Sequence, residues 1–200
     1  MARNDAWPDH RRPRIHGHAR VHASRGAEVT GLDASAVMLD AARSRAARAG
    51  IPATLVEGRL ERLPFADAAF DVVSAIAVLC FVSDVRAALR EMARVLRPGG
   101  ALVIGELGRW SLWAATRRCR GWLARKPGAA RFRSASELRG FATDAGLSVV
   151  GVRRAVFYPP SGAAARLMAA IDPVLARMTT FGAAFVALKA VKTEAPRVCA

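Results

Sequence analysis

The fold is decided by residues 82–100, VSDVRAALREMARVLRPGG, and by residues 101–107, ALVIGEL, which follow without a break. In the first stretch apolar residues recur at the spacing of a helix with one buried face, and charged residues fall on the other side. The apolar set is Val85, Ala88, Leu89, Met92, Val95 and Leu96, and the charged set is Arg86, Arg90, Glu91, Arg94 and Arg97. Pro98, Gly99 and Gly100 are expected to end this helix, and residues 101–106 to form a buried strand.

The same alternation of strand and helix extends to both sides of this stretch. Upstream, we expect strands over residues 27–32, 53–57 and 70–76, and a helix that Ser35 caps and Gly50 stops. Downstream, Ser134 and Glu137 form a capping box that opens another helix, which Gly146 ends. Residues 147–152 and 181–191 are predicted to be the strands that finish the sheet. Strands separated by helices of about 10–15 residues predict an α/β fold with a doubly wound, mostly parallel, Rossmann-like sheet.

Composition limits the classes of protein to which the chain can belong. Its 200 residues suffice for one α/β domain, and its formal net charge is +15. All but three of its 31 basic residues are Arg, and this bias favours a solvated basic surface over specific nucleic-acid binding. Cys80, Cys119 and Cys199 form no Cys-x-x-Cys pair, which argues against a disulfide framework or a zinc site. With no secretory signal and no apolar run long enough for a bilayer, the sequence predicts a cytoplasmic protein without a metal centre.

Four stretches carry a resemblance to a known family: EVTGLDAS (28–35), GRLERLPFADAAFDVV (58–73), VSDVRAALREMARVLRPGG (82–100) and ALVIGEL (101–107). They resemble class I S-adenosylmethionine-dependent methyltransferases, and in particular the small-molecule, type 11 group near the ubiquinone/menaquinone methyltransferases. The helix that ends in Leu-Arg-Pro-Gly-Gly before an apolar strand is the most specific of the four. The resemblance implies an enzyme that moves the sulfonium methyl group of S-adenosylmethionine to an O, N or C atom of a small acceptor, lipophilic acceptors included.

The resemblance also implies a set of cofactor-binding residues, namely Asp33, Ala34, Arg59, Leu60 and Ile76. A carboxylate at the carboxyl end of a parallel strand can accept both ribose hydroxyls, which is the role expected for Asp33. The alternative is that Asp33 caps the following helix. The family usually has Gly-Asp-Ala where this chain has Gly58-Arg59-Leu60. Because a guanidinium cannot accept a hydrogen bond, we expect adenine to rely on the backbone at Leu60 and on apolar contact.

Two further positions bear on catalysis. Glu106 ends the strand predicted over residues 101–106 and is the weak candidate for a catalytic base, with a structural or ligand-orienting role as the alternative. Because the sulfonium is already a strong electrophile, alignment of the reactants supplies much of the catalysis and a dedicated base is not required. Cys80 stands where many relatives have His, and we expect it to be a buried structural thiol.

Residues 1–24 depart from the family pattern. In the family, a first strand and an acidic residue followed by Gly-x-Gly-x-Gly form the floor of the cofactor site. Here the segment holds all four histidines of the chain among Arg and Pro. We expect a disordered or aberrant segment, produced by a frameshift or a misassigned start, rather than a metal site. Weak cofactor binding would follow, together with an oligomer or aggregate, because two buried strands would lack their neighbour.

Residues 108–133 form a basic segment that contains Trp110, Trp113 and Trp122 and no acidic residue. We interpret it as a lid between a methyltransferase core at 25–107 and the closing helix and strands of the same domain at 134–195. The alternative is a non-catalytic methyltransferase-like protein that binds nucleic acid, or a membrane surface peripherally, through this segment.

Overall fold

The computed structural model describes residues 27–108, 131–155 and 185–193. The predictions for residues 1–24, for most of the basic segment 108–133 and for residues 181–184 lie outside the described residues. The chain divides into two units, Met1–Arg59 and Leu60–Ala200. No helix within the described ranges is both long and apolar enough to cross a membrane.

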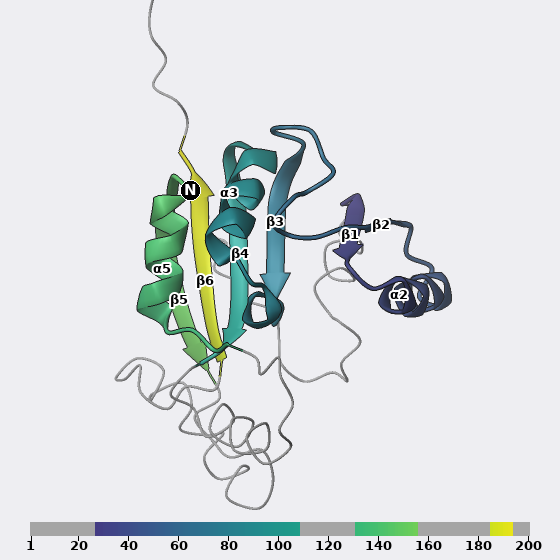
Figure 1. The fold of residues 1–200 in the computed structure, drawn as a ribbon. Coiled ribbons are helices and arrows are strands. Elements are labelled where there is room, and N and C mark those ends of the chain that lie inside the picture. Colours follow the sequence, from purple (N-terminus) through teal and green to yellow (C-terminus); the bar gives the residue numbers. More distant parts are fainter. Residues whose placement is uncertain (1–26, 109–130, 156–184, 194–200) are drawn as a thin grey trace, which may run out of the picture. The chain divides into compact units, whose positions relative to one another are not determined.

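The described elements of the first unit are β1 (Val29–Asp33), α2 (Ala36–Arg48) and β2 (Ala53–Glu57). β1 and β2 pair in parallel, with Asp33 opposite Glu57, and α2 connects them (Figure 1). Ser35 is the N-cap of α2, because its hydroxyl accepts a hydrogen bond from the backbone N–H of Met38 at 3.4 Å. The strand–helix–strand order predicted for this part of the chain is confirmed.

The second unit contains β3 (Phe70–Ile76), the 3₁₀ helix η1 (Leu79–Phe81), α3 (Val85–Val95), β4 (Leu96–Leu107), α5 (Ala135–Asp144), β5 (Leu147–Ala155) and β6 (Phe185–Lys192). Its strands form one sheet in the order β3-β4-β6-β5 (Figure 1). β3 and β4 are parallel, whereas β6 is antiparallel to both β4 and β5. The mixed α/β architecture is confirmed, and the antiparallel β6 is a feature that the spacing of the elements did not indicate.

The core of the second unit lies between its sheet and the helices α3 and α5, which pack on the sheet and against each other. The apolar stripe predicted for α3 is buried, and so are its partners on the strands and on α5. The fully buried large side chains are Leu79, Leu89, Met92, Val95, Leu96, Leu102, Ile104, Leu138 and Leu188. Each side chain of this size contributes about 1.5–3 kcal/mol when it leaves water. This burial fixes α3 on the sheet.

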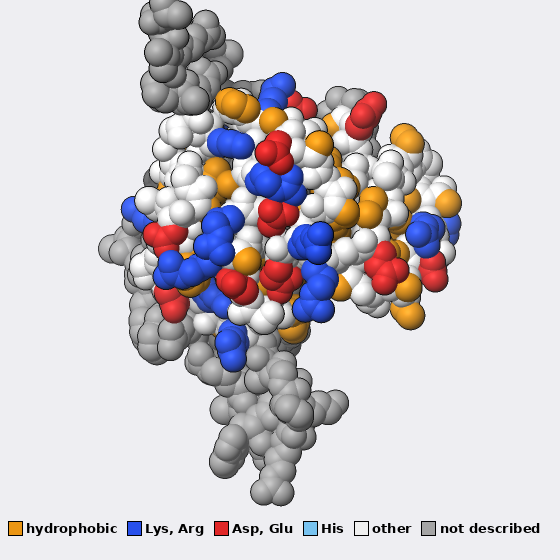
Figure 2. Space-filling view, turned by 45° about the horizontal axis from the view of Figure 1, so that its top comes forward, with side chains coloured by type: hydrophobic (Ala, Val, Ile, Leu, Met, Phe, Trp, Pro, Cys, Tyr) orange, Lys and Arg blue, Asp and Glu red, His pale blue; other side chains and the backbone are white. Residues whose placement is uncertain are grey.

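Charged side chains occupy the surface in a mixed arrangement. Figure 2 shows Lys and Arg interspersed with Asp and Glu over one face of the described part of the protein. A single-sign patch, which steers a polyanion, is not what this face presents. On this face the basic side chains are therefore exposed among acidic ones.

The boundary between α3 and β4 differs from the expectation. α3 ends at Val95, Leu96 is extended (φ −74°, ψ 135°), and β4 begins there rather than at residue 101. Leu96 pairs with Phe70, and a register shift between Phe70 and Val72 accommodates the residues that follow it. Arg97 precedes proline, a position that favours extended backbone. The prediction that Pro98, Gly99 and Gly100 end the helix was therefore wrong, because they belong to β4.

Gly100 lies where two backbone segments approach closely. A Cβ at this position would lie 2.8 Å from the carbonyl oxygen of Arg97 and 3.0 Å from that of Asp71. Because backbone atoms cannot turn aside as a flexible side chain can, we expect Gly100→Ala to lower the free energy of unfolding by ~1–3 kcal/mol. The matched control is Gly140→Ala in α5, where a Cβ would meet nothing within 4 Å. Helix propensity predicts a gain of ~0.5–1 kcal/mol for the control. Urea unfolding followed by circular dichroism measures both, and an unchanged Gly100→Ala variant would contradict the close approach.

Candidate functional site

Asp33 is the last residue of β1, and its side chain is half-buried. The backbone N–H of Ser35 donates a hydrogen bond of 2.9 Å to Asp33 Oδ1. Since Ser35 is the N-cap of α2, the alternative in which Asp33 caps this helix is wrong. A carboxylate has about four acceptor positions, of which one N–H occupies one. Asp33 therefore keeps the capacity to accept hydroxyl donors from a ligand.

The first unit brings three of the expected site residues to one edge. β1 and β2 are parallel, so their carboxyl ends lie side by side, and the N–H of Gly58 donates to the carbonyl oxygen of Asp33 at 3.0 Å. Ala34 follows β1 directly, Arg59 is the second residue after β2, and both are exposed. Ligands of α/β folds bind outside the carboxyl ends of parallel strands. This edge of the first unit is therefore its candidate ligand-binding surface.

The second unit brings Ile76 and Glu106 together in the same way. Ile76 ends β3 and lies opposite Gly105 of the parallel strand β4, so that Glu106 is the next residue along. Leu60, which is half-buried, begins the loop 60–69 that leads to β3. The expected site residues are thus divided between the units, with Asp33, Ala34 and Arg59 on the first and Leu60, Ile76 and Glu106 on the second.

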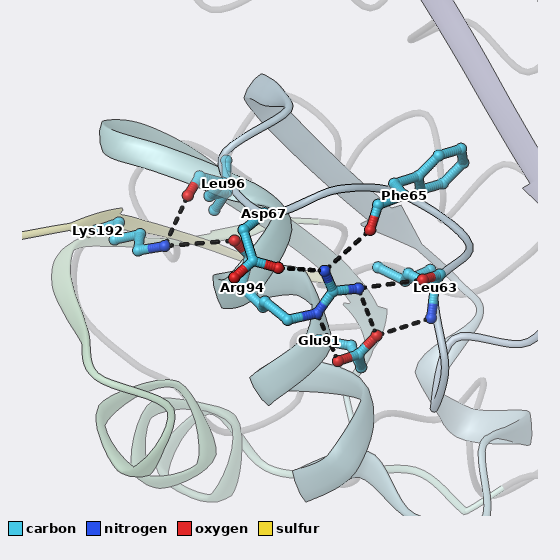
Figure 3. A network of polar contacts seen from close by, with 7 residues as sticks. All are labelled: Leu63, Phe65, Asp67, Glu91, Arg94, Leu96 and Lys192. Atoms are coloured by element: carbon cyan, nitrogen blue, oxygen red, sulfur yellow. Dashed lines mark hydrogen bonds and ion pairs between the residues drawn. The ribbon is translucent and has the colours of Figure 1, made fainter.

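The side chain of Arg94 connects the loop 60–69 to α3 through hydrogen bonds and an ion pair (Figure 3). The guanidinium of Arg94 donates to the carbonyl oxygens of Leu63 (3.1 Å) and Phe65 (2.9 Å). It also forms ion pairs with Asp67 (2.6 Å) and Glu91 (2.8 Å). Glu91 in turn accepts the backbone N–H of Leu63 at 2.8 Å. The sequence pattern placed Arg94 and Glu91 on the charged face of the helix and did not reveal this role.

The interactions in this cluster favour the charged forms of both Glu91 and Arg94. The hydrogen bonds from Arg94 lower the pKa of Glu91 to about 2 against the opposing effect of burial, and the N–H of Leu63 acts in the same direction as Arg94. The hydrogen bonds to Glu91 and Asp67 raise the pKa of Arg94 above its ordinary value. The side chains of Arg94 and Glu91 are 31% and 22% exposed, so solvent screens this pair less than it screens a fully exposed one.

Glu106 is buried, with 2% of its surface exposed. Its Oε1 accepts the backbone N–H groups of Val78 (3.0 Å) and Leu79 (2.7 Å). Burial raises the pKa of this carboxyl, and the two N–H groups oppose that effect. A general base must reach the proton that it removes. A buried oxygen that already accepts two backbone donors suits the orienting alternative better than the role of base.

Cys80 is buried, as expected, and its thiol donates to the carbonyl oxygen of Ala77 at 3.8 Å. Within the described ranges no group of three or more His, Cys, Asp or Glu side chains could hold a metal ion. The four histidines lie in residues 1–24, outside those ranges.

Comparison with known proteins finds a similarity to the same family over part of the chain. Residues 16–104 match the family described as "Methyltransferase domain". Over these residues the chain is similar to this methyltransferase family. The fold is similar to that of an S-adenosylmethionine-dependent methyltransferase of Thermotoga maritima at a TM-score of 0.63 and 26% identity, covering 82% of this chain and 72% of that one. The Rossmann-like α/β fold and S-adenosylmethionine as the methyl donor of the family are thereby confirmed.

Three curated relatives show how far the similarity extends. An uncharacterized protein of Mycobacterium tuberculosis is 40% identical over 136 residues, which cover 66% of this chain and 45% of the relative. The malonyl-[acyl-carrier protein] O-methyltransferase of Serratia marcescens is 39% identical over 94 residues, covering 47% and 35%. The demethylmenaquinone methyltransferase of Tropheryma whipplei is 43% identical over 88 residues, covering 44% and 36%. The chain spans less than half the length of each of them.

The pH dependence of stability should reveal the contribution of Glu91. The pKa of Glu91 is about 2 in the folded protein, below its ordinary value of 4.5. Its stabilising effect is therefore complete above that ordinary value and is lost as the pH falls toward the folded-state pKa. Glu91→Gln keeps an acceptor for the N–H of Leu63 but removes the charge facing Arg94. We expect its free energy of unfolding to be ~1–3 kcal/mol lower at neutral pH, with the deficit shrinking toward pH ~2.

The matched control is Asp40→Asn, which removes an ion pair with Arg43 whose side chains are 73% and 58% exposed. For this exposed pair we expect a change below about 0.5 kcal/mol. Denaturant unfolding of the three proteins at a series of pH values gives the comparison. A deficit of Glu91→Gln that did not depend on pH would show that the charge of Glu91 is not what stabilises the loop.

Proposed function

We propose that the protein transfers a methyl group from S-adenosylmethionine to a small-molecule acceptor. The family match supports the cofactor class, and the observation that carries the proposal for this chain is Asp33. Its half-buried carboxylate stands at the carboxyl end of β1, and the helix that follows is capped by another residue. A carboxylate so placed can accept the two ribose hydroxyls of the cofactor as charge-assisted hydrogen bonds.

The reaction requires alignment more than acid–base chemistry. A lone pair on O, N or C of the acceptor attacks the sulfonium methyl carbon, the carbon–sulfur bond breaks, and its electron pair stays on sulfur, which leaves S-adenosylhomocysteine. Any proton lost from the acceptor passes to solvent. Because the sulfonium is already a good leaving group, holding the acceptor atom, methyl carbon and sulfur in line supplies much of the rate enhancement. Under this proposal the residues of the site bind and orient the two reactants.

The acceptor is proposed to have an apolar body. One relative is named for demethylmenaquinone and another for the malonyl group of an acyl-carrier protein, so a quinone-type ring and a thioester are the two chemistries to compare. Phe81, 66% exposed beyond the carboxyl end of β3, favours the ring. An aromatic surface contributes to binding planar apolar groups through stacking.

Cofactor affinity is proposed to be weak in the chain as printed. The residues before Asp33 contain no Gly-x-Gly-x-Gly stretch, and Arg59 cannot accept the adenine amino group. Both features remove contacts that the family's pattern supplies. We therefore expect the 200 residues to bind S-adenosylmethionine in the millimolar range, and micromolar affinity would overturn this part of the proposal.

The role of Asp33 is tested by calorimetry at millimolar S-adenosylmethionine. Asp33→Ala should weaken binding roughly 10- to 100-fold, because hydrogen bonds to a charged group contribute about 1.5–3 kcal/mol. Asp40→Ala, on an exposed position of α2, is the matched control and should leave affinity unchanged. Transfer of tritiated methyl to a 1,4-naphthoquinol or to a malonyl thioester then distinguishes the acceptors. Equal affinity of Asp33→Ala and the unaltered chain would remove Asp33 from the cofactor site.

A further inference from the structure

Residues 77–81 form a turn at the carboxyl ends of β3 and β4, and the end of β4 holds it. The N–H of Ala77 donates to the carbonyl oxygen of Gly105 at 2.6 Å, and those of Val78 and Leu79 donate to Glu106. Ala77 has a φ of +55°, a left-handed conformation that a side chain disfavours. Such a conformation persists only where the surroundings determine it, and such residues cluster at functional sites.

The same turn is held from a second direction by residues that precede α5. Arg133 Nη1 donates to the carbonyl oxygen of Leu79 at 3.2 Å, and the N–H of Arg131 donates to that of Cys80 at 2.9 Å. The side chains of Leu79 and Cys80 point into the protein, at 0% and 6% exposed, whereas that of Phe81 is 66% exposed. A backbone fixed on two sides therefore presents one large apolar side chain at the surface.

The burial of Glu106 needs an explanation, because removing a carboxylate from water is unfavourable unless it is hydrogen-bonded. Stability alone could be served by an apolar residue of the same size, as it often is for buried charges. What a carboxylate adds is a strong acceptor for two adjacent N–H groups, which fixes the backbone that carries them. The function of this acceptor is then to hold the turn in one conformation at the edge where ligands of parallel sheets bind.

We propose that Glu106 is a positioning residue and that Phe81, which the turn presents, selects the acceptor by packing on a planar apolar ring. This inference rests on the proposed methyl transfer and assigns two residues of this chain to the recognition of its acceptor. An exposed aromatic side chain on a mobile loop would lose conformational freedom on binding, whereas one on a fixed turn is already placed. The two hydrogen bonds that Glu106 accepts from the turn therefore increase the affinity for the ring that Phe81 can provide.

The experiment measures binding of 2,3-dimethyl-1,4-naphthoquinone to the 200-residue chain without cofactor, by saturation-transfer NMR. Both positions that react with thiols are blocked in this probe, so only reversible binding is observed. Phe81→Ala should weaken binding roughly tenfold, and Phe81→Tyr, which keeps the ring, should restore it. Val150→Ala, at a 59% exposed residue of β5, is the matched control and should change nothing. An undiminished affinity in Phe81→Ala, or no binding to the unaltered chain, overturns the proposal.

The positioning role of Glu106 is tested with Glu106→Met, which removes the acceptor at similar length, and with Glu106→Gln, which keeps an acceptor oxygen. Amide hydrogen exchange at Val78 and Leu79 should accelerate about tenfold or more in Glu106→Met and stay close to the unaltered rate in Glu106→Gln. Naphthoquinone binding should follow the same order, and adding Phe81→Ala to Glu106→Met should weaken it no further. Unchanged exchange at both amides, or additive losses, overturns the role. If Glu106→Met does not fold, Glu106→Gln and amide exchange in the unaltered chain still decide it.

S-adenosylmethionine affinity should be the same in all variants. A chain that binds neither ligand therefore refutes the proposed function, whereas a chain that binds only the cofactor refutes this inference.

Discussion

The guanidinium of Arg94 is the contact on which the position of the loop 60–69 in the second unit depends. It ties the loop 60–69 to α3, and the same end of the helix receives Lys192 of β6. The ammonium of Lys192 donates to the carbonyl oxygens of Leu96 (2.7 Å) and Arg94 (3.4 Å) (Figure 3). A helix ends in unsatisfied carbonyls and a partial negative charge, and a cation at that place satisfies both. The loop before β3, the start of β4 and the end of β6 are therefore positioned at one junction.

The sequence predicted the elements whose signals are local. The stripe of apolar residues in α3 repeats within one helix, and the capping box of α5 lies within four residues. Both bonds of that box are present, with the N–H of Glu137 donating to Ser134 Oγ and that of Ser134 donating to Glu137 Oε2. The predicted bounds of β2 and β3 agree with the observed Ala53–Glu57 and Phe70–Ile76. These features depend on neighbours along the chain, so periodicity and capping rules suffice for them.

What the sequence did not predict depends on residues far apart in the chain. Arg94 contacts residues 27, 29 and 31 positions earlier, and Glu106 contacts backbone groups 27 and 28 positions earlier. Helical periodicity assigns a charged residue to the polar face without showing whether that face meets water or a loop. Leu96 joins β4 because it pairs with Phe70, a contact that no local rule contains. The spacing of Glu91 and Arg94 was the available signal, and it showed only that the two could pair on one helix face.

Asp33 and Glu106 stand near the carboxyl ends of strands in two parallel pairs, and their surroundings separate their chemistry. Asp33 is half-buried and accepts one N–H, whereas Glu106 is 2% exposed and accepts two N–H groups on one oxygen. A carboxylate in contact with water can exchange that water for the hydroxyls of a ligand. A buried one serves the groups with which it folds, because leaving them unpaired is costly. Acids at strand ends can be found from sequence alone, but burial decides which one suits ligand recognition and which one shapes the backbone that a ligand meets.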